Sequence, residues 1–290
     1  MKTVVGLIGA GLMGVGIAAN LVRHGHALHL LDHPGNQPLD ALLEDGARLH
    51  TSARAVASEV EVLLVCVTGS PQVEAVLTGP DGALAGLRPG ALVVDLSTSI
   101  PSSTEKMAAL VRAAGAHFID AAMTRTPKEA AEGRLNLLVG GEAALLERCR
   151  PVLACFAENI FHAGPVGAGH RMKLLHNFVS LGLVTLIAEA AACAQRADVP
   201  AEVFVDVLAR GGGGGIALDR LKPYLLEQDI GALRFSVANA CKDLGYYQTM
   251  AADSGAECTV AHAVLDTLTR AAQAEPGAML PEMVRLIAQR

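Results

Sequence analysis

A glycine-rich turn directly after an apolar run is the feature that most restricts how this chain can fold. The run Val4–Ile8 is short and apolar, and Gly9-Ala10-Gly11-Leu12-Met13-Gly14 follows it at once. The first glycine permits a tight turn, the second lets a phosphate approach the backbone, and the third lets a helix pack on the strand. The order therefore predicts a strand, a turn and a helix whose N-terminus binds the pyrophosphate of a dinucleotide.

The rest of the cofactor site is expected at the ends of later apolar runs. Asp32 ends the second run, where a carboxylate can accept hydrogen bonds from the adenosine ribose hydroxyls. It would repel a 2′-phosphate, and His33 and Pro34 provide no arginine to neutralise one. The sequence thus favours NAD over NADP, unless Asp32 merely caps a turn. We expect cofactor contacts from Gly9, Gly11, Leu12, Met13, Gly14, Asp32 and, at the end of the third run, Val67.

Apolar runs alternate with helical patterns through the first half of the chain. This alternation predicts an α/β fold with a doubly wound parallel sheet. After Pro165 the strand-like runs stop and helical patterns follow. We therefore expect a Rossmann dinucleotide-binding domain at 1–164 and an all-α domain for substrate and dimerisation at 165–290, with the Gly211–Gly215 run as a loop between helices. The expected later strands lie at 28–31, 62–67, 92–95, 118–120 and 136–139.

Composition argues against several classes of partner. The chain has 29 acidic and 23 basic residues, a formal net charge of -6, and no Lys/Arg cluster that could follow a phosphate backbone, so no nucleic acid is expected. Its six cysteines are scattered without a Cys-x-x-Cys pair, which predicts reduced thiols, no metal site and a cytoplasmic location.

Two uncharged stretches need an explanation other than a membrane. Residues 3–22 contain five glycines, which fit a strand-to-helix turn better than a signal peptide or a lipid-facing helix. The run Phe178–Ala188 is too short to span a bilayer and predicts a buried helix. Its apolar character suggests burial between subunits, so we expect a homodimer or homotetramer.

A second motif opens the helical half. In Gly167-Ala168-Gly169-His170-Arg171-Met172-Lys173, followed by Leu174-Leu175-His176-Asn177, Lys173 and Asn177 lie one helical turn apart. The pattern Gly-x-Gly-x-x-x-Lys-x-x-x-Asn after a dinucleotide fold resembles the β-hydroxyacid dehydrogenase family, which includes 3-hydroxyisobutyrate dehydrogenase. The resemblance implies that Lys173 donates the proton during carbonyl reduction and that Asn177 orients the lysine and the substrate hydroxyl.

Further segments carry the same resemblance along nearly the whole chain. Asp95-Leu96-Ser97-Thr98-Ser99-Ile100-Pro101 is similar to the family's Asp-x-Ser-Thr-x-x-Pro, which implies that Thr98 lies by the nicotinamide ribose. Asp120–Thr126 occupies the place of the substrate loop, so Thr124 and Thr126 are expected to bind substrate. Lys242-Asp243-Leu244 is similar to the family's Lys-Asp-Leu, which implies that Lys242 binds substrate and cofactor; an ordinary surface ion pair is the alternative.

Some positions depart from the family pattern. Arg125 stands where relatives usually have glycine, and a guanidinium suits a carboxylate, sulfonate or phosphate. This loop, and Arg171 two residues before Lys173, resemble the branch with sulfolactaldehyde reductase and 4-hydroxybutyrate dehydrogenase. Arg125 pointing into solvent is the alternative. His176 replaces an asparagine, and Ala274–Gly277 lacks the usual Gly-x-Gly-x-x-Asp ending.

The sequence thus predicts an NAD-dependent dehydrogenase of small, acidic hydroxy acids or semialdehydes. An imine reductase of the same architecture is one alternative, although such enzymes generally lack the lysine and favour NADPH. A catalytically inactive nucleotide sensor is another, and it leaves Lys173, Asn177 and Lys242 unexplained. Turnover of NADH with semialdehydes or with cyclic imines distinguishes the three.

Overall fold

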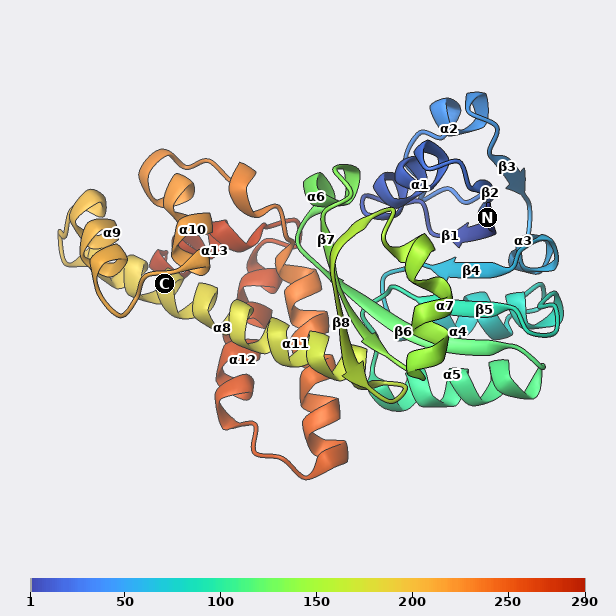
Figure 1. Cartoon of the computed structure of the whole chain (residues 1–290). Helices are drawn as coiled ribbons and strands as arrows, with labels where there is room; N and C mark the ends of the chain where they lie inside the picture. Colours follow the sequence, from blue (N-terminus) through green and yellow to red (C-terminus); the bar gives the residue numbers. More distant parts are fainter. Residues whose placement is uncertain (1, 290) are drawn as a thin grey trace. The chain divides into compact units, whose positions relative to one another are not determined.

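The computed structural model describes residues 2–289, and the chain forms two compact units, Met1–Lys173 and Leu174–Arg290. The first unit contains the sheet and its helices, and the second is helical (Figure 1). The sequence places the domain boundary at 164. The compact units divide after Lys173, inside helix α8 (Ala168–Arg196), which begins in the first unit and continues into the second.

An eight-stranded sheet with the order β3-β2-β1-β4-β5-β6-β7-β8 organises the first unit. All neighbouring pairs are parallel except β6 and β7. The order reverses between β1 and β4, and ligands of such sheets bind beyond the carboxyl ends of the strands at that reversal. The strands are β1 Val4–Ile8, β2 Ala27–Leu31, β3 Arg48–His50, β4 Val62–Val65, β5 Leu92–Asp95, β6 His117–Thr124, β7 Leu135–Gly140 and β8 Ala157–Gly164.

Alternate residues of the inner strands enter two separate cores, one on each face of the sheet. Val62 and Leu64 pack with residues of α1, α2 and α7, whereas Leu63 and Val65 pack with residues of α3, α4 and α5. Burial on both faces explains why these strands read as continuous apolar runs. The helices are α1 Gly14–Arg23, α2 Asp40–Glu44, α3 Ala53–Glu59, α4 Ser70–Thr78, α5 Pro101–Ala113, α6 Pro127–Ala131 and α7 Ala143–Leu153, with a 3₁₀ turn η1 at Ala83–Ala85.

The predicted α/β class and all six predicted strands are confirmed, and three features were missed. Strands β3 and β8 lie at the two edges of the sheet and expose much of their length, so neither carries an apolar run. The sheet is also not entirely parallel, since β7 returns antiparallel to β6. The link between them holds only the five-residue helix α6, and a parallel return needs a longer crossover.

The second unit packs its helices around one apolar core that includes Leu181, Leu221 and Leu268. The Gly211–Gly215 run lies between α9 and α10, as predicted. Length and composition alone would let α8 cross a membrane, and half of its most apolar window is buried within the protein. The helices after α8 are α9 Ala201–Arg210, α10 Ile216–Glu227, α11 Val237–Ser254, α12 Thr259–Ala274 and α13 Met283–Ala288, with 3₁₀ turns η2 Gly231–Leu233 and η3 Leu280–Glu282.

The backbone of α1 lies so close to the backbone of α6 that only glycine fits at position 16. A Cβ on Gly16 would lie 2.7 Å from the Ala131 nitrogen. One turn later the buried Asn20 donates its amide to the Ala130 carbonyl oxygen at 2.9 Å. The helix that begins at the glycine turn is thereby tied to the helix that follows the Thr124–Thr126 loop.

Replacing Gly16 by alanine tests this contact. Alanine favours a helix over glycine by about 1 kcal/mol, but its methyl group would push α6 away, and overpacking typically costs about 1–3 kcal/mol. We expect Gly16→Ala to lower the midpoint of thermal unfolding. Gly245, inside α11, is the matched control, because a Cβ there meets open space. Gly245→Ala should raise the midpoint slightly; equal shifts in both variants would contradict the close packing of α1 on α6.

Candidate active site

The predicted glycine turn connects β1 to α1 and leaves space where a pyrophosphate is expected. Gly9 has φ +100°, and a Cβ on it would lie 2.1 Å from the Cys66 carbonyl oxygen. A Cβ on Gly14 would lie 2.0 Å from the Gly9 carbonyl oxygen, so both glycines are required by the fold itself. A Cβ on Gly11 would meet nothing within 4 Å. Gly11 is therefore the position whose missing side chain opens the backbone to a ligand, and the turn fits a dinucleotide phosphate.

Asp32 lies just beyond the carboxyl end of β2, the strand beside β1. Its backbone N–H donates to the His50 carbonyl oxygen at 2.8 Å, which fixes its backbone to β3, and its side chain is exposed. His33 faces its own turn, because its Nδ1 accepts from the Gly35 N–H at 3.0 Å. The carboxylate is thus available to a ribose at the edge where the glycine turn opens.

The loop after β5 carries three hydroxyl groups, and two of them serve the protein. Ser97 Oγ accepts from the Val67 N–H at 3.1 Å, and Ser99 Oγ donates to the buried Asp95 carboxylate at 3.4 Å. Ser97 and Ser99 are buried, whereas Thr98 is half-buried. Thr98 therefore has the hydroxyl best placed for a cofactor, and Val67 is tied to the same loop.

The Thr124–Thr126 segment begins at the last residue of β6 and turns sharply into α6. Arg125 has φ +80°, a conformation that favours glycine. Its guanidinium donates to the Arg134 carbonyl oxygen and pairs with Glu158, so it neither points freely into solvent nor stands alone. Thr124 is buried and accepts from Asn136 at 3.1 Å, and Thr126 donates its N–H to Glu129 at 3.0 Å, starting α6.

The start of α8 is held by a buried carboxylate from the sheet. Asp120 Oδ1 accepts from the Gly167 N–H at 2.7 Å and Oδ2 from the His170 N–H at 2.8 Å. Burial raises the pKa of Asp120, although the neighbouring His170 ring and these two N–H groups oppose the shift. A Cβ on Gly169 would lie 2.2 Å from the Leu138 carbonyl oxygen, so glycine lets α8 begin against β7. Lys173, half-buried, follows one turn later.

In the helical unit, Asn177 is bonded to a residue that the sequence analysis did not single out. Its Nδ2 donates to Asp243 Oδ2 at 2.6 Å, and its Oδ1 lies 3.0 Å from His176 Nδ1. Lys242 Nζ forms an ion pair with Asp243 Oδ1 at 2.8 Å and lies 5.1 Å from the Tyr246 ring centre. The buried Asp243 carboxylate thus joins the two predicted residues Asn177 and Lys242.

Asp120, Asp243 and His170 were missed because their partners lie far away in the sequence. Asp120 begins the Asp120–Thr126 segment, and Asp243 is the aspartate of the Lys-Asp-Leu motif. An aspartate inside a motif, when the motif gives it no contact with a ligand, is the sequence signal for a buried support of this kind. Within residues 2–289 no cluster of three His, Cys, Asp or Glu side chains could hold a metal ion.

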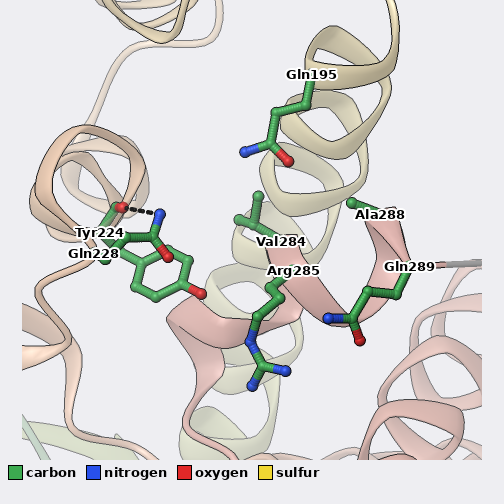
Figure 2. A pocket seen from close by; sticks show the side chains of 7 residues that line it. All are labelled: Gln195, Tyr224, Gln228, Val284, Arg285, Ala288 and Gln289. Atoms are coloured by element: carbon green, nitrogen blue, oxygen red, sulfur yellow. Dashed lines mark hydrogen bonds between the residues drawn. The ribbon is translucent and has the colours of Figure 1, made fainter.

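The helical unit also has a hollow that contains none of the predicted site residues (Figure 2). It has a volume of about 230 Å³. Gln228 donates to the Tyr224 carbonyl oxygen at 3.1 Å on one wall, and Arg285 pairs with Glu275 and Glu282. The lining residues are Gln195, Tyr224, Gln228, Val284, Arg285, Ala288 and Gln289.

Two family profiles match nearly the whole chain. A profile described as the NAD binding domain of 6-phosphogluconate dehydrogenase matches residues 4–164. Another, described as the NAD-binding of NADP-dependent 3-hydroxyisobutyrate dehydrogenase, matches residues 167–287.

Individual proteins agree with the profiles. The NAD-dependent L-serine dehydrogenase of Pseudomonas aeruginosa is 35% identical over 76% of this chain and 74% of its own length. The 3-sulfolactaldehyde reductase of Escherichia coli is 33% identical over 83% of this chain and 80% of its own. The structure of 3-hydroxyisobutyrate dehydrogenase from Mycobacterium tuberculosis with L-serine superimposes with a TM-score of 0.88, at 28% identity, over 98% of this chain and 99% of that one.

Proposed function

This chain belongs to the 3-hydroxyisobutyrate dehydrogenase-like β-hydroxyacid dehydrogenases, and we propose that it acts on a small aldehyde or hydroxy acid carrying an additional acidic group. It is an NAD(P)-dependent oxidoreductase that transfers a hydride between nicotinamide and a small hydroxy acid or semialdehyde. The observation that carries the proposed acidic group is Arg125, whose guanidinium already pairs with the Glu158 carboxylate. The proposed chemistry rests on Lys173, placed one turn beyond the Asp120-bound start of α8.

Each part of the proposed reaction has a group in this chain. The nicotinamide cofactor, when bound, supplies or accepts the hydride. The turn at Gly9, Gly11 and Gly14 would bind its pyrophosphate, Asp32 and Thr98 its two riboses, with Leu12, Met13 and Val67 alongside. As the carbonyl is reduced, negative charge grows on its oxygen, and a proton donor must lie within about 3 Å of it. We assign that proton to the Lys173 ammonium group, and the orientation of the substrate hydroxyl to Asn177.

Asn177 can orient a substrate only because its own rotamer is fixed. Its amide is held between Asp243 and His176, so the group presents one defined edge rather than rotating. Asp243 also pairs with Lys242, which we propose contacts both substrate and cofactor. The aspartate is thus a support for both residues.

Thr124, Arg125 and Thr126 are proposed to contact the acidic group of the substrate. In the structure Arg125 pairs with Glu158, and the two side chains are 26% and 46% exposed. Ion pairs at such exposure are worth about 0–1 kcal/mol, so a substrate anion can displace Glu158 at little cost. The acidic class includes sulfolactaldehyde and succinic semialdehyde, in keeping with the similarity to a 3-sulfolactaldehyde reductase.

We also propose a cytoplasmic homodimer or homotetramer. Val179, Leu183 and Leu186 follow one another at helical spacing along α8, and their side chains are exposed. Apolar stripes of this kind are typical of subunit contacts. Sedimentation of the purified protein measures the assembly directly.

Lys173→Ala should lower kcat about a hundredfold or more, the usual contribution of a general acid, while NADH still binds. Lys173→Arg should be nearly as damaging, because a guanidinium does not release its proton at neutral pH. Both rates follow from NADH absorbance with a panel of acidic semialdehydes. Lys106→Ala, on exposed α5 surface, is the control and should leave kcat unchanged. Equal loss of NADH affinity and of turnover in Lys173→Ala would contradict the assignment.

The proposed preference for NAD(H) depends on the charge of Asp32. We expect a higher kcat/KM with NADH than with NADPH. Asp32→Ser combined with His33→Arg should move the preference toward NADPH, since a repulsive charge is removed and an attractive one added. Comparable kcat/KM values for both cofactors in the wild type would show that Asp32 does not select the cofactor.

Arg125→Gly should cost about ten- to a hundredfold in kcat/KM for the acidic substrate, the equivalent of about 1.5–3 kcal/mol for a charge-assisted contact. Aldehydes without the anion should change little. The variant should not lose thermal stability, because glycine suits φ +80°.

Glu158→Gln is the matched variant for this site. It frees the Arg125 guanidinium and should lower KM for the acidic substrates. If each variant changed kcat/KM equally for acidic and non-acidic aldehydes, or changed it for neither, Arg125 would have a structural role alone.

A further inference from the structure

A cluster of polar residues lies buried in the first unit, and the proposed reaction makes no direct use of it. Its members come from the end of β5 and the loop after it, from α5, from the middle of β6 and from the start of α8. Every member is at most 3% exposed, and buried polar groups of this kind are expected to be fully hydrogen-bonded. The members are Asp95, Ser97, Ser99, Thr104, Asp120 and His170.

His170 is the centre of the cluster. Its Nε2 lies 3.1 Å from the Ser97 carbonyl oxygen, which has no proton, so Nε2 must donate. Its Nδ1 lies 2.7 Å from Thr104 Oγ1, and that hydroxyl is also 3.1 Å from the Ile100 carbonyl oxygen. A hydroxyl has one proton. If Thr104 donates to Ile100, then Nδ1 also carries a proton and His170 is a cation; if Thr104 donates to Nδ1, His170 is neutral.

The charges around the ring decide between these two arrangements. Asp95 and Asp120 each bring an Oδ2 atom to 3.9 Å from a ring nitrogen. Asp95 accepts from the Ser97 N–H at 2.9 Å and Asp120 from two N–H groups. The two N–H groups on Asp120 oppose the rise that burial gives to the pKa of that carboxyl. Two buried carboxylates without a cation would be very unfavourable, and a positive His170 compensates both.

Other ionisable groups beside the cluster do not offer that compensation. Burial, with the charge of Asp95, raises the pKa of the Cys66 thiol to about 12, so Cys66 is neutral. Arg171 and Glu105, at the outside of the cluster, pair with each other. Lys173 lies one turn further along α8 and is the group that the reaction uses.

We propose that His170 is a positioning residue, held as an imidazolium ion between Asp95 and Asp120. It fixes the loop with Ser97 and Thr98 to the start of α8, and its charge promotes proton release from Lys173. The part concerning Lys173 rests on the proposed function. Residues three apart on a helix are neighbours, so the two positive charges repel each other. That repulsion makes the Lys173 ammonium a stronger acid.

The charge of His170 can be measured without any turnover. ¹⁵N NMR of histidine-labelled protein with bound NADH distinguishes a ring with both nitrogens protonated from a ring with one. The chain has 10 histidines, so the spectra of His170→Gln and His170→Asn identify the signal by its loss. We expect both ring nitrogens of His170 to be protonated at pH 7.5. A neutral ring with a proton on Nε2 alone would overturn the proposal, whatever the enzyme reduces.

The effect on Lys173 is measured from the pH dependence of kcat/KM for aldehyde reduction. Glutamine can donate to Ser97 and accept from Thr104 but carries no charge. His170→Gln should therefore move the alkaline limb, where Lys173 loses its proton, upward by on the order of one pH unit. Thr104→Val removes a hydrogen bond and no charge, and should leave the limb in place. An unmoved limb in His170→Gln, or equal movement in both variants, would refute the electrostatic role.

Failure of the proposed function gives a different result. In that case no aldehyde is reduced by the wild type, and the NMR measurement alone decides the state of His170. If His170→Gln does not fold, as judged by circular dichroism, His170→Asn provides the signal assignment and the pH profile.

Discussion

The contact between the Asp120 carboxylate and the first turn of α8 is the constraint on which the rest of this structure depends. Both carboxylate oxygens accept backbone N–H groups at the helix start, where the helix dipole also favours a negative charge. A Cβ on Gly140 would lie 2.5 Å from Asp120 Oδ1, and one on Gly169 2.8 Å from Oδ2. The glycines of this region are therefore needed so that strand β6 can hold the helix that carries Lys173.

The same contact links the cofactor side of the first unit to the start of α8. Strand β6 lies beside β5, whose end leads into the loop with Thr98, and His170 bonds to that loop through the Ser97 carbonyl oxygen. On the other side, the Thr124–Thr126 segment continues β6 directly and is tied to α1 through α6. One strand thus determines the positions of the Thr124–Thr126 segment, the start of α8 and the loop that carries Thr98.

The parts of this molecule that were predictable from sequence are those governed by local pattern. Inner strands buried on both faces give unbroken apolar runs, and the glycine turn has a fixed spacing, so six strands and the cofactor motif could be recognised. The edge strands β3 and β8 lack that burial and gave no signal. The antiparallel return of β7 follows from the length of a connection, which a periodicity search does not measure.

The support of the site was not predictable in the same way. Asp120 finds its partners 47 and 50 residues later, and Asn177 finds Asp243 66 residues later, so these bonds exist only after folding. Arg125 was expected to bind an anion, and in the structure it already has one, the Glu158 carboxylate. A sequence motif therefore indicated which residues matter, whereas the fold was needed to show what holds them.

Transfer of deuterium from the cofactor to a substrate carbon is the most direct test of the account. The protein would be incubated with NADH that carries deuterium in both positions at the nicotinamide C4, together with one acidic semialdehyde at a time, and the products examined by mass spectrometry and NMR. The account predicts one deuterium on the new carbinol carbon, with hydroxy acid formed in step with NADH consumed. Absence of deuterated hydroxy acid from every semialdehyde, with NADH still bound, would contradict it; so would transfer to cyclic imines alone.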